Sequence, residues 1–323
     1  MTRSYAGALA GLLVLMFCVT CPKMGTPEDS PQDSLLNPLR KYHRFRHLRP
    51  FRPELERLAN RLIKEGQASE IAVYFRSLND GVWIGINEKT RFAPASLMKV
   101  PLMMLYLKET EKNPSLMEKE LTVVPSSHYL QFFPSKVRLK KDEQYKVGEL
   151  LKIMIHDSNN DAMNTLFANA DPDTGMKMYQ QLGIAASFSD PDDYLSLKTY
   201  TGLFRVLYNA TYLNEKMSEK ALNYLAHTPF DGGIVAGVPK NVTVANKFGE
   251  FASKGTRLKQ LHDVGIVYHP INPYLLGIMT RGKDYERLAE AIKTISAFIY
   301  NEVDQQYKRQ DQQDIPYAFE QEG

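Results

Sequence analysis

The sequence predicts an α+β fold, with an antiparallel sheet flanked by N- and C-terminal helices and an all-helical subdomain inserted in the middle. Two strand-like runs, residues 70–78 and 82–86, enclose the turn signal Asn-Asp-Gly near the start. Strand-like runs return only after residue 242, and helical spacing dominates between them. Because the order is hairpin, helices, strands and a last helix, the late strands are expected to complete a sheet that the hairpin begins.

Each element has its own signal. Leu55, Leu58 and Leu62 repeat at helical spacing, and Glu65-Gly66 offers a stop. A helix opens at Pro94-Ala95 and another covers Val147–Asp157, where the apolar residues lie on one side. The remaining elements are predicted as helices around 161–182 and 198–213, strands at 242–248, 264–269 and 274–281, and an amphipathic helix over about 284–306.

Composition excludes several classes of protein. The 323 residues are 43% hydrophobic with a net charge of +3, so neither a disordered chain nor a general affinity for nucleic acid is expected. Cys18 and Cys21 are the only cysteines, which excludes a disulfide framework, a cysteine nucleophile and a cysteine-ligated zinc from the rest of the chain. No metal or organic cofactor is implied, and the protein is expected to be a monomer.

Residues 1–24 are predicted to be a signal peptide or a membrane anchor. Arg3 precedes an apolar run, Ala6–Cys21, which is shorter than the roughly 20 residues of a bilayer span. Cleavage, lipid attachment at Cys21 and retention as an anchor stay open, so we expect an exported protein, periplasmic or extracellular, that contacts membrane only through this segment. The rest divides into a Pro-rich and basic linker at 25–50, a folded domain at 51–309 and a polar tail at 310–323.

Ser96 and Lys99 form Ser-x-x-Lys at the start of a predicted helix, a spacing that puts both side chains on one face. A serine hydroxyl becomes nucleophilic when a neighbouring base takes its proton, and a lysine with a lowered pKa can do so. The helix N-terminus also directs backbone N–H groups to the place where an oxyanion would form. By itself, however, such a short motif occurs by chance in a chain of this length.

Two further motifs follow in order. Ser158-Asn159-Asn160 comes at the end of an apolar helix, and Lys247-Phe248-Gly249 lies in a predicted strand. Ser-x-x-Lys, Ser-x-Asn and Lys-x-Gly in this order form the signature of the penicillin-recognising serine enzymes. Over roughly residues 52–306 the chain resembles a class A β-lactamase, which implies the β-lactamase/transpeptidase fold.

The resemblance implies a role for each motif residue. Ser96 would attack an amide carbonyl, Lys99 would take or relay its proton, and Ser158 would pass that proton to the leaving nitrogen. Asn160 would hold the substrate's side-chain amide, and Lys247 would attract a substrate carboxylate. Gly249 and Glu250 would complete the substrate-binding strand, and the backbone N–H of Glu250 would share the oxyanion with that of Ser96.

The chain also departs from this family. Class A enzymes carry a Glu that activates the deacylating water, and no Glu lies between Asn160 and Glu215. Asp192 is the candidate in one alignment register; in the other, which we favour, the loop is shorter, residues 195–200 already begin the next helix, and no base is left. Asn159 replaces a carboxylate of the family motif, and Glu250 stands where a small hydroxylated residue is usual.

These observations predict a serine hydrolase acylated by a β-lactam or a related peptidoglycan-derived amide, with slow hydrolysis of the acyl-enzyme. The alternatives are a D-alanyl-peptide carboxypeptidase, another amide or ester hydrolase, and a non-catalytic penicillin-binding domain. A Ser-His-Asp triad is not expected, because no nucleophile elbow is recognisable and His156 and His262 are predicted to bond to local backbone.

Overall fold

The structure is a computed structural model that describes residues 35–36, 48–126, 131–184, 195–252 and 258–314, with the side chains of the helix that ends at Asp314 described only as far as Lys308. The predicted signal or anchor, most of the linker, residues 315–323 of the polar tail and Asp192 therefore lie outside the described residues, whereas residues 310–314 continue the last helix. Within these ranges no helix is both long enough and apolar enough to span a membrane.

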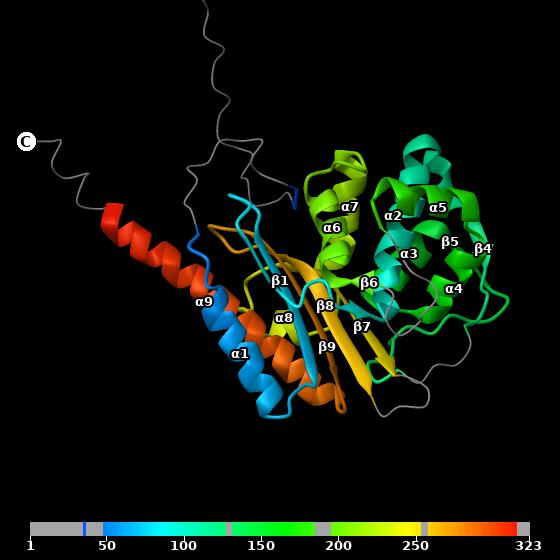
Figure 1. The fold of residues 1–323 in the computed structure, drawn as a ribbon. Helices are drawn as coiled ribbons and strands as arrows, with labels where there is room; N and C mark the ends of the chain where they lie inside the picture. Colours follow the sequence, from blue (N-terminus) through cyan, green and yellow to red (C-terminus); the bar gives the residue numbers. More distant parts are fainter. Residues whose placement is uncertain (1–34, 37–47, 127–130, 185–194, 253–257, 315–323) are drawn as a thin grey trace, which may run out of the picture. The chain divides into compact units, whose positions relative to one another are not determined.

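A five-stranded antiparallel sheet organises the molecule, with strand order β2-β1-β9-β8-β7 (Figure 1). The predicted hairpin forms β1 and β2, and the three late strands complete the sheet as expected. The strands are β1 (Glu70–Ser77), β2 (Trp83–Ile86), β7 (Val244–Ala252), β8 (Lys259–Val267) and β9 (Tyr274–Gly282). Two-stranded ladders also join β3 (Arg91–Phe92) to β6 (Leu195–Ser196) and β4 (Glu120–Thr122) to β5 (Gln144–Lys146).

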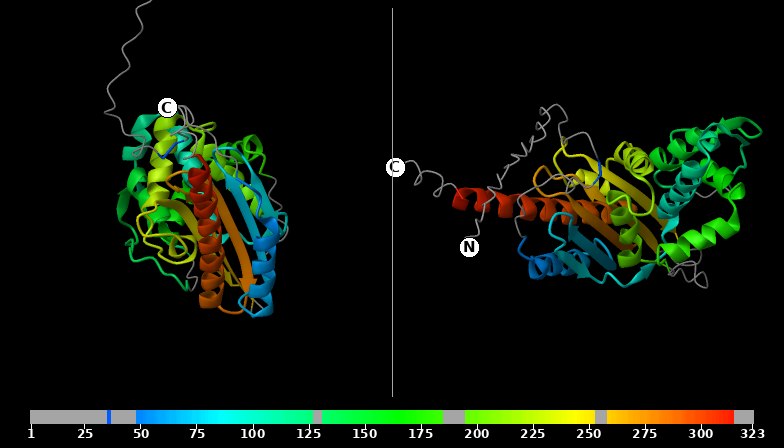
Figure 2. Two further views of the ribbon diagram at one scale, coloured as in Figure 1. Left: turned by 90° about the vertical axis from the view of Figure 1, so that its left-hand side faces the viewer. Right: turned by 90° about the horizontal axis from the view of Figure 1, so that it is seen from above.

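One face of the sheet is covered by the first and last helices, α1 (Arg52–Lys64) and α9 (Tyr285–Asp314), with the short α8 (Gly233–Ala236) beside them (Figures 1 and 2). Apolar residues at helical spacing, among them Leu55 and Leu58 of α1, pack there with the strand residues Ile71, Val73 and Phe75. The predicted terminal helices are thus confirmed as the layer on this face. The last one runs eight residues further than the apolar pattern indicated.

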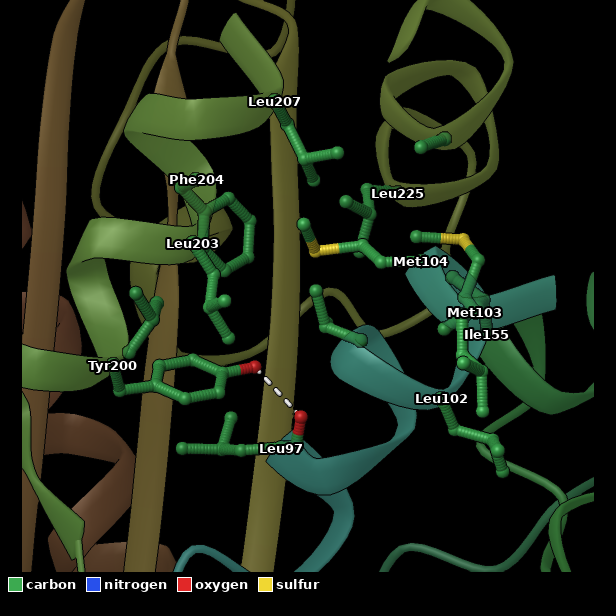
Figure 3. Close-up of a cluster of buried hydrophobic side chains, with 14 of the residues drawn as sticks. Leu97, Leu102, Met103, Met104, Ile155, Tyr200, Leu203, Phe204, Leu207 and Leu225 are labelled. Carbon is green, nitrogen blue, oxygen red and sulfur yellow. Dashed lines mark hydrogen bonds between the residues drawn. The ribbon is translucent and has the colours of Figure 1, made fainter. Parts of the chain in front are cut away.

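The other face carries the helical part of the chain, which is inserted between β3 and β7 (Figure 1). Its core consists of apolar side chains from several helices, gathered around Leu97, Met103, Tyr200 and Phe204 (Figure 3). The elements are η2 (Ala95–Met98), α2 (Lys99–Lys112), η3 (Pro114–Glu118), α3 (Val147–His156), α4 (Asn160–Ala168), α5 (Pro172–Gln181), α6 (Leu197–Tyr208) and α7 (Glu215–Ala226). The predicted insertion of a helical subdomain is confirmed, and the short β4–β5 ladder lies within it.

The sheet presents its edge strand β7 to the helices at η2, where the chain passes from the sheet part to the helical part. Gly249 makes this approach feasible, because a Cβ atom there would lie 2.7 Å from the Pro94 carbonyl oxygen. The predicted motifs lie at or beside this junction: one on η2 and α2, one between α3 and α4, and one on β7.

Candidate active site

Ser96 lies in the 3-10 turn η2, directly before α2 begins at Lys99. The preceding Ala95 has a φ of 49°, in the left-handed region that L residues rarely adopt. Such strained backbone persists where the surrounding structure enforces it, which is common at functional sites. The three-residue spacing brings the Lys99 ammonium group to 3.0 Å from the Ser96 hydroxyl oxygen.

Lys99 is completely buried, and its Nζ atom has four oxygen neighbours. Besides the Ser96 hydroxyl, Nζ lies 2.8 Å from Oδ1 of Asn160, 3.1 Å from the Ser158 hydroxyl and 2.5 Å from the Ser158 carbonyl oxygen. Burial holds the pKa of Lys99 well below its usual value, and the nearby charge of Lys247 lowers it further. A lysine in this state can take a proton from the hydroxyl beside it.

Ser158 connects the two buried lysines. It follows α3 with a φ of 52°, and this left-handed turn directs both its carbonyl and its hydroxyl at Lys99. The Ser158 hydroxyl also accepts a hydrogen bond of 2.9 Å from Lys247. A continuous chain of polar groups therefore runs from Ser96 through Lys99 and Ser158 to Lys247, and protons can be exchanged along it.

Lys247 projects from β7 and is also buried. Its ammonium group donates to the Phe248 carbonyl oxygen at 3.0 Å and lies 4.3 Å from the centre of the Phe248 ring. Burial lowers its pKa to about 7, against the opposing charges of Asp263 and Glu250. No carboxylate of the described residues forms an ion pair with either lysine, so both positive charges depend on dipoles and on more distant anions.

Asn159 and Asn160 have separate tasks. Asn160 faces Lys99, whereas Asn159 turns away and accepts a hydrogen bond from the backbone N–H of Ala162, capping α4. The Asn159 amide also donates to the Ser135 hydroxyl at 3.1 Å and to the Val137 carbonyl at 2.7 Å. A carboxylate at this position has no proton to donate to that carbonyl, which explains why an amide suits this chain.

The Glu250 carboxylate is bound by backbone groups of a segment more than 100 residues away. Its two oxygens accept hydrogen bonds from the backbone N–H groups of Phe132 and Phe133, at 2.9 and 3.1 Å. Burial raises its pKa, while these two hydrogen bonds and the lysines oppose the shift. We call residues 131–137 the strap, because Glu250 of β7 holds one end of it and Asn159 holds the other.

The structure therefore brings Ser96, Lys99, Ser158, Asn160 and Lys247 into one hydrogen-bonded group, with Gly249 and Glu250 on the adjoining strand. Asp192 lies outside the described residues, and its role stays a prediction. In the alignment register without a general base, residues 195–200 begin the next helix. The structure places Ser196 at the N-cap of α6, where its hydroxyl accepts a hydrogen bond from the Thr199 backbone N–H.

The other polar residues considered in the sequence bond elsewhere. Arg281 of β9 pairs with Glu70, and His156 contacts Asp157. The buried His262 bonds to backbone, but to Ala93 and Thr280, which are distant in the sequence, and not to the local backbone that was predicted. No group of histidines, cysteines or carboxylates that could hold a metal ion occurs within the described ranges.

Sequence reasoning missed the residues that position η2. The Gln260 side chain accepts a hydrogen bond from the Ala93 N–H, His262 bonds to the Ala93 carbonyl, and the Tyr200 hydroxyl donates to the Leu97 carbonyl at 2.8 Å (Figure 3). Behind Lys247, the buried Asp263 accepts hydrogen bonds from Asn246 and from the Ile234 N–H. For Gln260, His262 and Asp263, the available signal was their position as polar residues in an otherwise apolar strand.

Known structures share this fold. PBP-A is 20% identical to this chain with a TM-score of 0.68, and the match covers 81% of this chain and all of PBP-A. A PBP-A mutant, solved as an acyl-enzyme complex with penicillin G, is also 20% identical, with a TM-score of 0.67 and the same coverage of both chains. A β-lactamase from Xanthomonas campestris pv. campestris is 20% identical with a TM-score of 0.67, over 77% of this chain and 97% of that one. Among curated proteins, no sequence matches this chain.

A family model described as the β-lactamase enzyme family matches residues 54–303. That range begins in α1, ends in α9 and contains all three motifs. Because the match extends over most of the sequence, this chain belongs to the β-lactamase enzyme family.

Proposed function

We propose that this chain is a serine hydrolase of the class A type, acylated at Ser96 by a β-lactam or a related cell-wall amide. The observation that carries the proposal is the Lys99 side chain, which is buried 3.0 Å from the Ser96 hydroxyl, lacks a carboxylate partner among the described residues and has a lowered pKa. Family membership and the fold support a β-lactam-type serine hydrolase.

In the proposed acylation, the Ser96 oxygen forms a bond to the amide carbonyl carbon, the carbon–nitrogen bond breaks, and protons move from Ser96 to Lys99 and to the leaving nitrogen. Lys99, in its neutral form, takes the Ser96 hydroxyl proton while the serine oxygen bonds to the amide carbonyl carbon. When the carbon–nitrogen bond breaks, the leaving nitrogen receives a proton through the Ser158 hydroxyl, which is bonded to both lysines. Lys247 contributes positive charge throughout this step.

We further propose that the acyl-enzyme is released slowly. No Glu occurs between Asn160 and Glu215, and Ser196 already caps α6, which supports the register without a general base. An ester that lacks a base to activate water hydrolyses slowly, because general base catalysis typically contributes about 10²–10⁴ in rate.

Intact-protein mass spectrometry after mixing with benzylpenicillin tests both statements. We expect the wild-type protein to form a long-lived adduct that is heavier than the free protein by the mass of benzylpenicillin. The Ser96→Ala variant should form no adduct. Absence of both adduct and hydrolysis would overturn the proposal. Rapid hydrolysis would overturn slow release only, and Asp192→Asn would then trap the adduct if Asp192 is the base.

The location of the reaction is a separate proposal. The apolar run Ala6–Cys21 supports export, so that the enzyme acts as a monomer outside the cytoplasm on a small molecule derived from the cell wall or on an antibiotic. Fractionation of expressing cells, with and without residues 1–24, tests it: the protein should change compartment when the segment is deleted.

A further inference from the structure

Two residues of the predicted linker, Leu35 and Leu36, are held against the folded domain. The backbone N–H of Leu35 donates to both carboxylate oxygens of Glu219 in α7, at 3.0 and 3.1 Å. The Leu35 carbonyl accepts a hydrogen bond of 2.7 Å from the hydroxyl of Tyr268, which follows β8. Both leucine side chains pack against the core of the helical part. These hydrogen bonds join positions 184 and 233 residues apart, so the linker is bound by tertiary contacts.

The two side chains that hold Leu35 suit a peptide main chain. The Glu219 carboxylate accepts the N–H, and the Asn223 amide, one turn further along α7, donates to the same carboxylate at 3.2 Å and fixes its orientation. Burial raises the pKa of Tyr268 well above its usual value, so its hydroxyl keeps the proton that it donates to the carbonyl. Both polar main-chain groups of one residue therefore find a matching partner.

The other end of this stretch is held as well. The Leu48 N–H donates to the Asp80 carboxylate at 2.9 Å, in the turn between β1 and β2, and the Leu48 side chain is buried. Gln306 of α9 exchanges two hydrogen bonds with the backbone of Arg49, at 2.8 and 3.0 Å. The stretch that begins at Leu35 is thus bound at α7 in the helical part and again beside the sheet.

We propose that Glu219 and Tyr268 form a docking site for the segment that precedes the folded domain, with the main chain of Leu35 as its occupant. The chain before Leu35 then joins the body at α7 and the end of β8, and not at the start of α1. The folded domain, predicted to begin at residue 51, accordingly begins at Leu35. This inference does not depend on acylation of Ser96.

Docking at Leu35 shortens the tether on which the domain can move. An extended chain spans at most about 3.5 Å per residue, so a chain attached at Cys21 could reach about 50 Å to Leu35. A linker free as far as Phe51 would allow about 100 Å. The docking site therefore halves the greatest distance between the domain and an attachment at Cys21, one of the alternatives left open by the sequence.

Hydrogen exchange of the full chain tests the site. It is followed by mass spectrometry on overlapping peptides that resolve residues 35 and 36, with a synthetic peptide of residues 28–42 as the unprotected reference. We expect the Leu35 amide to exchange at least 100-fold more slowly in the protein than in the peptide. Glu219→Ala removes the acceptor and Tyr268→Phe removes the donor, so each should lose 10-fold or more of this protection.

Two further variants are matched controls. Tyr208→Phe removes a buried hydroxyl that has no hydrogen-bond partner among the described residues, although its ring lies 6.4 Å from that of Tyr268. Glu149→Ala removes an exposed carboxylate from α3. Both controls should keep the wild-type protection of Leu35.

Three results would overturn the inference. The first is a Leu35 amide that exchanges as fast in the protein as in the peptide. The second is protection that is unchanged in Glu219→Ala or Tyr268→Phe, or lost equally in the controls. The third is faster exchange of β1 in either test variant, because the two side chains would then stabilise the body of the domain and not the docked linker.

Discussion

Lys247 places an ammonium group in the interior, where the charged form is poorly solvated. Its pKa of about 7 in the folded protein lies below the value near 10.5 of an exposed lysine. The unfolded chain therefore binds more protons between these two values, so the free energy of unfolding rises with pH in this window. Below pH 7 the folded protein must bury the charge, and its stability is lowest with respect to this residue.

We expect Lys247→Met to raise the free energy of unfolding at pH 6 by about 2–4 kcal/mol, because it removes a buried charge. The advantage should shrink at pH 9, where the wild-type lysine has lost its proton. Urea denaturation at both pH values measures it, and Lys240→Met, at an exposed position, should show no such change. A variant less stable than the wild type at pH 6 would contradict the expectation.

Two tyrosines of α6 differ by one hydrogen bond. Tyr200 donates to the Leu97 carbonyl at 2.8 Å (Figure 3). The buried Tyr208 hydroxyl, by contrast, has no hydrogen-bond partner among the described residues. Tyr200→Phe removes this side-chain donor from a buried carbonyl of η2 and should cost about 1–2 kcal/mol of stability. Tyr208→Phe should be neutral or slightly stabilising. Thermal unfolding of the pair compares them, and equal losses would argue against this reading of η2.

At the scale of elements, strands and helices with regular apolar spacing were predicted well, among them β1, β2, α3 and β9. The N-terminal half of β8 was missed, because Gln260, His262 and Asp263 are polar residues that the fold buries. Their partners, Ala93 and Ile234, come from distant parts of the chain, and no local pattern reveals such pairs. α7 was not predicted either.

In the site, too, features that depend on neighbouring residues were predicted, whereas contacts between distant residues were not. The motifs identified the residues of the hydrogen-bonded group, since each short spacing is a local property. The strap could not be predicted, because the contacts of Phe132 and Phe133 with Glu250 join positions more than 100 residues apart. In the sequence alone, a carboxylate directly after Lys-x-Gly has no visible partner. In the structure its oxygens accept hydrogen bonds from the strap backbone.

Asn159 links α4 to the strap, and this element-level role can be tested. Asn159→Asp keeps the cap on α4 but replaces the amide donor to Val137 with an acceptor. We expect a loss of about 1–2 kcal/mol in stability together with slower acylation. Asn214→Asp, at the cap of α7, retains its acceptor for Met217 and should change stability by less than about 0.5 kcal/mol. Similar losses in both variants would assign the effect to capping alone.

At the scale of the whole molecule, the sheet part and the helical part meet where β7 passes η2. Gly249 makes this approach feasible, and a Cβ atom there would lie 2.7 Å from the Pro94 carbonyl and 3.1 Å from Cγ of Leu97. Gly249→Ala should therefore displace η2 from β7 and slow acylation by 100-fold or more. Circular dichroism should show intact secondary structure. Gly202→Ala, where nothing lies within 4 Å, is the matched control, and a fast Gly249→Ala enzyme would contradict this account.

The position of β9 also affects how the protein can be made. β9 lies between β1 and β8 although it is the last of the five strands to be synthesised. Until the ribosome has delivered residues 274–282, β1 and β8 each keep a row of unpaired backbone groups exposed to neighbouring chains. A nascent chain stalled before Tyr274 would therefore hold two open sheet edges together with a helical part that is already complete in sequence, and such a chain needs protection from aggregation.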